Sequence, residues 1–223
     1  MSHNETFFIN EEFYALKASP QEMDAFWANG WRHFGENFFR YNLAFYAGEI
    51  RMVVPLRIRL SNFSLSRSQR RTLKKNQDLQ TIIRPAEITP EKKILFKQHK
   101  RRFKRGVPNS IYDFLSFDAA RAPCEVLEVC VYAREKLLAA SFFAIGEISI
   151  SSIYAMFALE ESPRSLGIFT ILLEIDFAQK HQKEFYYQGY AYTGNSFYDY
   201  KKRFSALEFF DWNGNWLKFE SEL

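Results

Sequence analysis

The stretch that decides the fold is residues 125–157, EVLEVCVYAREKLLAASFFAIGEISISSIYAMF. It holds three runs rich in β-branched, aromatic and small apolar residues, at 125–132, 137–145 and 148–157. Such runs are typical of buried strands. The connections between them are short, which favours antiparallel neighbours. We therefore expect a three-stranded antiparallel meander in this part of the chain.

The residues after the meander predict a helix and then more strands. Pro163 and Gly167 mark a turn. Apolar residues then recur with helical spacing, at Ile168, Ile171, Leu172, Ile175 and Ala178. Strand-like runs follow at 184–190 and 207–212. This order predicts an α+β protein with a GNAT-like (acyl-CoA N-acyltransferase-like) sheet, mixed but mainly antiparallel, with flanking helices.

A smaller α+β region is expected in front of that sheet. Its first segment is weakly helical, a helix begins at Ser19-Pro20, and strand-like runs occupy 37–46 and 51–60. A connection with Pro85 and Pro90 suggests a boundary, which gives an N-terminal region at 1–84 and a GNAT-like domain at 85–223. Helices are expected at 91–105 and 110–117.

Composition narrows the class of protein. The chain has 223 residues, of which 47% are hydrophobic and 18% aromatic, and this excludes wholesale disorder. Cys124 and Cys130 form neither a disulfide framework nor a CxxC pair, so both are expected in the core of a protein from a reducing compartment. We expect no metal site, no membrane partner and a cytoplasmic location. The longest apolar run, 137–145, is shorter than the ~18 residues of a membrane span.

A basic helix is the sharpest local signal. It begins after Ser66, whose spacing to Gln69 has the form of a capping box. Five cations project from one face, namely Arg67, Arg70, Arg71, Lys74 and Lys75. No acid appears before Asp78 to offset their repulsion. The stripe is either a solvated surface or, as we favour, a site for phosphate.

A second basic cluster surrounds His99 and Phe103. Its members are Lys97, Lys100, Arg101, Arg102, Lys104 and Arg105. If both clusters face one side, they suit an RNA backbone, and recognition would rest on shape and phosphate rather than on base sequence.

Two further stretches leave alternatives open. Residues 163–167, PRSLG, precede an apolar-striped helix, where amides attract anions and Arg164 adds charge. In a GNAT-like fold a cofactor pyrophosphate would lie there, although an ordinary helix entry fits equally well. Residues 186–204 carry many tyrosines that either line a stacking pocket or, as we slightly favour, pack as strand residues.

Six motifs occur in one order. They are NGWRHFG at 29–35, PLRI at 55–58, SRSQRR at 66–71, RSLG at 164–167, and YQGY at 187–190 followed by YKKRF at 200–204 with Glu208. In this order and spacing they resemble the bacterial aminoacyl-tRNA–protein transferases, the leucyl- and arginyl-transferases of the N-degron pathway. The resemblance covers residues 26–216 and is most specific at PLRI and SRSQRR.

The resemblance implies a function and a set of residues. The family transfers Leu or Arg from aminoacyl-tRNA to the N-terminal amine of a protein, usually one with an acidic first residue, and so marks it for degradation. No cofactor is implied beyond aminoacyl-tRNA as co-substrate, and the oligomeric state is left open. The expected tRNA-binding residues are Arg67, Gln69, Arg70, Arg71, Lys74 and Lys75. The donor- and acceptor-binding residues are Arg57, Arg164, Ser165, Leu166, Tyr187, Gly189, Lys201 and Arg203.

The chemistry expected from the resemblance needs few catalytic groups. The ester is already activated, and an α-amine with a pKa near 7.7–8.0 is partly neutral. Backbone amides at 165–167, including Gly167, are expected to receive the oxyanion, with Tyr190 and Tyr200 as phenolic candidates. The alternatives are an acyl-CoA-dependent N-acyltransferase and a tRNA- or peptide-binding pseudoenzyme.

The chain departs from the family pattern at its cysteines. The family's C-x-x-C-x-x-C run before PLRI is replaced by Ala47, Ile50 and Val53, and the cysteine between the YLGY and YK motifs is replaced by Asn195. Phe157, Ala158 and Leu159 stand where the family has YDP. We therefore expect a divergent member without any metal or redox function of those thiols.

Overall fold

A computed structural model describes residues 8–104 and 106–220. Its helices are α1 (Pro20–Ala28), α2 (Arg67–Lys75), α3 (Pro90–His99) and α4 (Leu166–Lys180), with short 3-10 segments η1 (Leu60–Asn62), η2 (Lys100–Arg102), η3 (Ile111–Asp113), η4 (Leu159–Arg164) and η5 (Phe197–Arg203). The strands are β1 (Asn10–Tyr14), β2 (Arg32–Phe34), β3 (Asn37–Tyr41), β4 (Leu43–Tyr46), β5 (Glu49–Arg59), β6 (Gln80–Pro85), β7 (Val126–Ala133), β8 (Lys136–Ile145), β9 (Ser149–Phe157), β10 (Phe185–Tyr192), β11 (Leu207–Phe210) and β12 (Trp216–Lys218).

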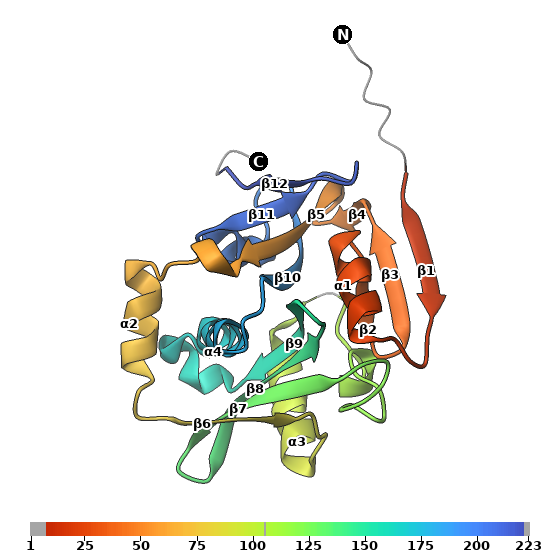
Figure 1. Cartoon of the computed structure of the whole chain (residues 1–223). Coiled ribbons are helices and arrows are strands. Elements are labelled where there is room, and N and C mark those ends of the chain that lie inside the picture. Colours follow the sequence, from red (N-terminus) through yellow and green to blue (C-terminus); the bar gives the residue numbers. More distant parts are fainter. Residues whose placement is uncertain (1–7, 105, 221–223) are drawn as a thin grey trace.

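One large sheet organises the molecule (Figure 1). Its strand order is β12-β11-β5-β10-β9-β8-β7-β6, and β4 pairs with β5 at the side. The meander β7-β8-β9 is antiparallel as expected, and every other pairing in this sheet is antiparallel except that of β9 with β10. A small sheet, β1-β3-β2, lies beside α1 (Figure 1). The predicted α+β, mainly antiparallel architecture is confirmed.

Local sequence signals account for the helix starts. Ser19 and Ser66 each cap a helix, and the side chains of Glu22 and Gln69 accept hydrogen bonds from the backbone N–H groups of these capping residues, which completes both capping boxes. In α4 the apolar stripe turns inward, and Phe169, Leu172 and Ile175 are buried. This helix packs on β8 and β9, and α2 packs on α4. The two helices that carry the RSLG and SRSQRR motifs are therefore neighbours.

Several sequence predictions were wrong in detail. The first described segment is not helical, because residues 10–14 pair with β3 as an edge strand. The run 37–46 is two strands, and the helix expected at 110–117 is only the short η3. The helix expected at 91–105 becomes α3 and then η2, which ends at Arg102, and Arg105 lies outside the described residues. Strands β6 and β12 were not expected.

The core is continuous across the sheet. Strands from both sides of residue 85 share it, so the domain boundary expected there stays a prediction and does not divide the sheet. Cys124 and Cys130 are unpaired and buried, as expected, and burial raises the pKa of both thiols. Within the described part of the chain, no helix has the length and apolar character that a membrane crossing needs.

Candidate functional site

The site begins where two parallel strands separate. Strands β9 and β10 pair only from Ser149 to Ser151 and from Phe185 to Tyr187, although both strands continue beyond that point. The side chain of Arg32, from β2, occupies the wedge. Its Nη2 donates to the carbonyl oxygens of Ser152 at 3.2 Å and Ile153 at 3.3 Å. Arg32 thus donates hydrogen bonds to two backbone carbonyls of β9 that lie just beyond the last residue paired with β10.

Two residues of β10 position Arg32. The guanidinium lies directly against Gly189, where any Cβ would collide with it. The neighbouring Tyr190 hydroxyl donates to the carbonyl of Gly30 at 2.6 Å and so holds the turn that leads into Arg32. Gly30 has a φ of +79°, a left-handed conformation that favours glycine. The Arg32 guanidinium also lies 5.6 Å from the centre of the Tyr190 ring.

A second arginine, Arg102, enters the same region from η2. Its guanidinium lies over Phe157 at 4.9 Å and over Phe197 at 4.6 Å. Its Nη1 lies 3.5 Å from Nε2 of His99. Burial lowers the pKa of His99 to about 4, so at neutral pH this imidazole is uncharged and does not neutralise the arginine or add to its charge.

Several tyrosines lie near one or both of these arginines. Arg32 interacts electrostatically with four tyrosines, Tyr41, Tyr190, Tyr198 and Tyr200. Arg102 interacts electrostatically with three, Tyr154, Tyr198 and Tyr200. Burial raises the pKa of Tyr200 to about 12, against the opposing influence of both arginines. The Tyr154 hydroxyl is buried and has no hydrogen-bond partner among the described residues. We call this set the arginine–tyrosine site; it comprises Arg32, Arg102, Lys201, Tyr41, Tyr154, Tyr190, Tyr198 and Tyr200.

The arginine–tyrosine site is positively charged without an acidic partner. Among residues 8–104 and 106–220, no Asp or Glu lies within 4.0 Å of the charged nitrogens of Arg32, Arg102 or Lys201. Lys201 is buried, and burial followed by the nearby Arg32 holds its pKa well below the usual range, which favours its neutral amine, so the positive charge of the site rests on Arg32 and Arg102. Buried cations are normally paired. The missing countercharge indicates a place for an anionic ligand.

The start of α4 borders this region. Gly167 faces Phe157, and a Cβ at that glycine would lie 3.0 Å from the Phe157 ring that supports Arg102. The first amides of a helix have no partner within it, so those of Leu166 and Gly167 can receive negative charge. The Leu166 side chain is buried in the core, and Ser165 is the N-cap but its side chain caps no amide. Only backbone groups of this stretch therefore fit the roles expected for it.

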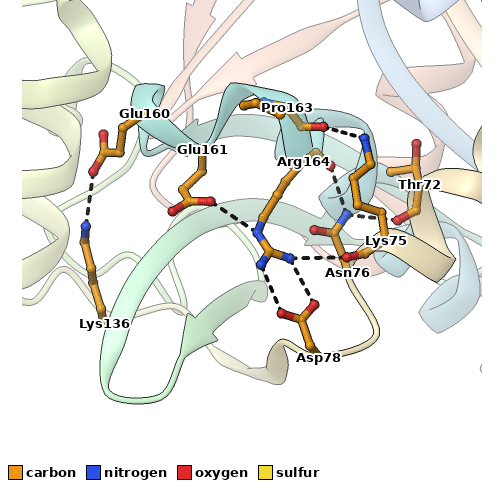
Figure 2. Close-up of polar contacts among 9 residues, drawn as sticks. All are labelled: Thr72, Lys75, Asn76, Asp78, Lys136, Glu160, Glu161, Pro163 and Arg164. Carbon is orange, nitrogen blue, oxygen red and sulfur yellow. Dashed lines mark hydrogen bonds and ion pairs between the residues drawn. The ribbon is translucent and has the colours of Figure 1, made fainter.

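The basic helix α2 is exposed and attached to the border of the site (Figure 2). Lys75 donates to the Pro163 carbonyl at 2.8 Å, and Asn76 donates to the Arg164 carbonyl at 2.9 Å. The side chains of Arg67, Arg70, Arg71, Lys74 and Lys75 are exposed, and none of them forms an ion pair with a described residue. The five-cation stripe is therefore accessible to a large polyanion.

Two predicted binding residues, Arg164 and Gln69, make contacts within the protein. Arg164 forms a two-pronged ion pair with Asp78, at 2.9 and 3.0 Å, and a further contact with Glu161 at 3.2 Å (Figure 2). Gln69 is buried in its capping box, and its Nε2 faces the Arg203 carbonyl at 3.5 Å. Both side chains thus already have protein partners, and the roles expected for Arg164 in donor or acceptor binding and for Gln69 in tRNA binding stay predictions.

The other sequence candidates separate into two groups. Arg57 is buried against Glu208 at 2.6 Å and contacts the hydroxyl of Tyr187, so both residues have protein partners, and their expected role in donor or acceptor binding stays a prediction. Tyr190, Lys201 and Gly189 do lie at the site, although the Lys201 ammonium is held by the Tyr190 carbonyl at 2.9 Å. The Tyr190 proton is committed to Gly30, whereas the Tyr200 hydroxyl has no protein partner in the described chain. Arg203 is exposed.

Sequence reasoning missed the two central arginines in different ways. Arg32 lies inside the NGWRHFG motif, but nothing in that motif tells that its side chain crosses to β9, 120 residues away. Arg102 was counted in the second basic cluster, and its position between His99 and Phe103 was the available signal. The exposed members of that cluster, such as Arg101, lie outside the site.

A buried acid lies beneath the sheet near this region. Glu174 of α4 accepts a hydrogen bond from the Tyr186 hydroxyl at 2.6 Å. Burial raises the pKa of Glu174 to about 7, in spite of hydrogen bonds that lower it. This carboxyl therefore changes its charge near neutral pH, unlike an exposed acid.

The raised pKa of Glu174 predicts how stability depends on pH. The folded state binds the proton more tightly than the unfolded state, so stability falls as the pH rises from about 4.5 to about 7. Relative to wild type, Glu174→Gln should therefore gain about 3 kcal/mol of unfolding free energy between pH 4.5 and pH 8. Urea unfolding of both proteins across this range measures the gain, and Glu12→Gln at an exposed position is the control. A constant difference between Glu174→Gln and wild type would contradict the prediction.

Sequence comparison finds one matching family model and several relatives that are named as enzymes. The family model described as "Arginine-tRNA-protein transferase, C terminus" matches residues 91–211. An aspartate/glutamate leucyltransferase of Xanthomonas axonopodis pv. citri is 34% identical over 175 residues, which is 74% of this chain and 70% of that protein. The protein of the same name from Xylella fastidiosa is 30% identical over 168 residues, 71% of this chain and 65% of that protein. The chain spans about two thirds of the length of these relatives.

One of two similar solved structures supports the predicted fold class. L-PGS from Bacillus licheniformis aligns with a TM-score of 0.50 at 12% identity, over 84% of this chain and 55% of that one. FemX aligns with a TM-score of 0.48 at 11% identity, over 79% and 61%. The α+β, GNAT-like arrangement expected from the strand and helix order is therefore observed.

Proposed function

We propose, because this chain belongs to the arginine-tRNA–protein transferase family, that it transfers an amino acid from aminoacyl-tRNA to the N-terminal amine of a protein. Leucine is the amino acid we favour, with arginine as the alternative, since the relatives are called aspartate/glutamate leucyltransferases. The words aspartate/glutamate in the names of these relatives also support an acceptor whose first residue is acidic. Marking of that acceptor for degradation completes the proposal.

One observation carries the proposal beyond the family match. The exposed cationic face of α2 is fastened, through Lys75 and Asn76, to the segment that leads into α4. That segment ends at the amides that border the arginine–tyrosine site. A tRNA acceptor stem bound along α2 could therefore direct its esterified end to the uncompensated positive charge.

The reaction needs positioning more than strong acid or base groups. The acceptor nitrogen attacks the ester carbonyl carbon, a C–N bond forms, and the C–O bond to the terminal adenosine breaks. The proton lost by the amine goes to the departing hydroxyl oxygen of that adenosine. We assign the backbone amides of Leu166 and Gly167 to the developing oxyanion, and Tyr200 to the transferred proton or to the ester.

A transfer assay tests the proposal directly. The protein is incubated with tRNA charged with labelled Leu or labelled Arg, together with peptides that begin with Asp, Glu or Ala. We expect label in the Asp and Glu peptides from one of the two tRNAs. Binding of tRNA without transfer to any peptide would support the pseudoenzyme instead.

The acyl-CoA alternative has less support from the geometry. It uses the helix entry at residues 164–167 for the pyrophosphate, and the Arg164 guanidinium of that entry is already bound to Asp78 and Glu161. Thermal shift with acetyl-CoA separates the two functions, since a clear response to acetyl-CoA and none to tRNA would favour the acyltransferase.

A further inference from the structure

We infer that Arg32 and Arg102 receive the side-chain carboxylate of the acceptor's first residue and so determine acceptor specificity. The inference rests on the proposed transfer function and assigns this role to Arg32, which lies outside both basic clusters, and to Arg102, one member of the second. Arg102 is the partly buried cation whose guanidinium lies over the rings of Phe157 and Phe197. Arg32 is the partly buried cation at the floor of the wedge between β9 and β10.

The hydrogen-bonding state of the two arginines supports this role. Arg32 uses Nη2 on the carbonyls of Ser152 and Ile153, and no described residue accepts a hydrogen bond from its Nε or Nη1. The single hydrogen bond of Arg102 is a long contact to neutral His99. A guanidinium has five donors, so both residues retain donors for a ligand. A carboxylate matches such donors in charge and in shape.

The surroundings fit a small carboxylate better than a tRNA phosphate. Arg32 and Arg102 are both partly buried, and aromatic rings cover them, including Phe34, Phe157 and Phe197. A phosphate chain remains largely hydrated and is served by the exposed stripe on α2. The orphaned hydroxyl of Tyr154 lies near Arg102 and offers one more donor to a buried acid. Loss of water around the site strengthens each of these contacts.

The first test removes the charge of Arg102. For Arg102→Gln we expect kcat/KM to fall about 10- to 100-fold for peptides that begin with Asp or Glu, as for the loss of a charge-assisted hydrogen bond. Peptides that begin with Asn or Gln have nearly the same shape but no charge, and their kcat/KM should stay unchanged. Arg102→Lys should restore part of the preference. The exposed neighbour Arg101→Gln is the control and should keep the preference of the wild type.

The second test displaces Arg32 without changing it. Gly189→Ala places a methyl group where the guanidinium lies, whereas Gly214→Ala puts the same group on a similar backbone, φ +93° against +83°, in open space. The preference for Asp over Asn peptides should fall in Gly189→Ala and persist in Gly214→Ala. Circular dichroism of both variants shows whether each one folds.

The outcomes distinguish this inference from the transfer function itself. If the wild type transfers nothing, the proposed function fails, and peptide binding still tests the site: the Asp peptide should bind more tightly than the Asn peptide, and Arg102→Gln should remove the difference. If Arg102→Gln weakens transfer equally to Asp and Asn peptides and raises the KM for aminoacyl-tRNA, Arg102 binds the tRNA and the inference is wrong. An Asp-over-Asn preference in Arg102→Gln equal to that of the wild type also overturns it.

Discussion

Reversing the charge of Arg70, Arg71 and Lys74 to glutamate should lower the affinity for aminoacyl-tRNA about 1000-fold at low salt. All three side chains are exposed on α2 and none has an acidic partner in the described chain. Each lost charge-assisted contact with a phosphate costs about 1.5–3 kcal/mol, and three at the lower end give this factor. The new carboxylates also repel the tRNA, so the loss should be at least this large.

The salt dependence of binding gives an independent readout. Each phosphate contact contributes about 0.7–0.9 to the slope of log K against log salt, so the triple variant should lose about 2–3 from that slope. Fluorescence anisotropy with charged tRNA at several salt concentrations measures both quantities. The helix should survive, because its capping box uses Ser66 and Gln69, which are unchanged.

A matched control carries the same change of charge on other surfaces. Lys17, Lys93 and Lys218 are exposed and lie away from α2, in the connection between β1 and α1, on α3 and on β12. Their joint replacement with glutamate should leave affinity within a few-fold of wild type. Equal loss in both triple variants would mean that net charge, not α2, holds the tRNA. Undiminished binding by the α2 variant at low salt would remove α2 from the proposed function.

Local patterns were sufficient to predict the elements that carry the site. The capping box at Ser66, the apolar stripe of α4 and the meander depend on neighbours within a few residues, and all three are observed. The exposed cationic face of α2 follows from helical spacing alone. The stripe could be recognised because nothing from elsewhere in the chain covers it.

Contacts between distant segments could not be predicted in this way. Arg57 was expected to bind donor or acceptor, but β5 is an interior strand, and β11 places Glu208 beside that arginine. Arg164 forms an ion pair with Asp78 because α2 packs on α4. The sequence of neither segment alone predicts this packing. A charged residue in a sequence does not reveal whether its counterion lies opposite. For the same reason the unpaired state of Arg32 and Arg102 required the structure.

Glu128→Gln should lower the free energy of unfolding by about 3–5 kcal/mol, the largest effect on stability that we expect. Glu128 is fully buried on β7 and accepts from Lys92 at 2.6 Å and from Arg84 at 2.8 Å. Lys92 is itself fully buried, and its other contact is the Glu87 carbonyl at 2.6 Å. Removal of the carboxylate leaves a buried ammonium without a countercharge, and this cost is of the stated size.

The exposed pair of Lys136 and Glu160 provides the matched control (Figure 2). Its atoms are 3.2 Å apart and both side chains are more than half exposed. Glu160→Gln makes the same chemical change and should cost less than about 1 kcal/mol, because water screens the pair. Urea unfolding at pH 7 gives both values. Similar costs for Glu128→Gln and Glu160→Gln would show that burial does not strengthen the Glu128 network.

Lys92→Met together with Glu128→Gln should cost less than the sum of the two single changes, since the double variant has no unpaired buried ammonium. The consequence for function follows from the position of Lys92 on α3, which continues into η2 and Arg102. If the network fixes α3 against β7, then Glu128→Gln, assayed in conditions where it is folded, should lose part of the preference for acidic acceptors. A destabilised variant that keeps the full preference would show that His99 and Phe157 hold Arg102 without this network.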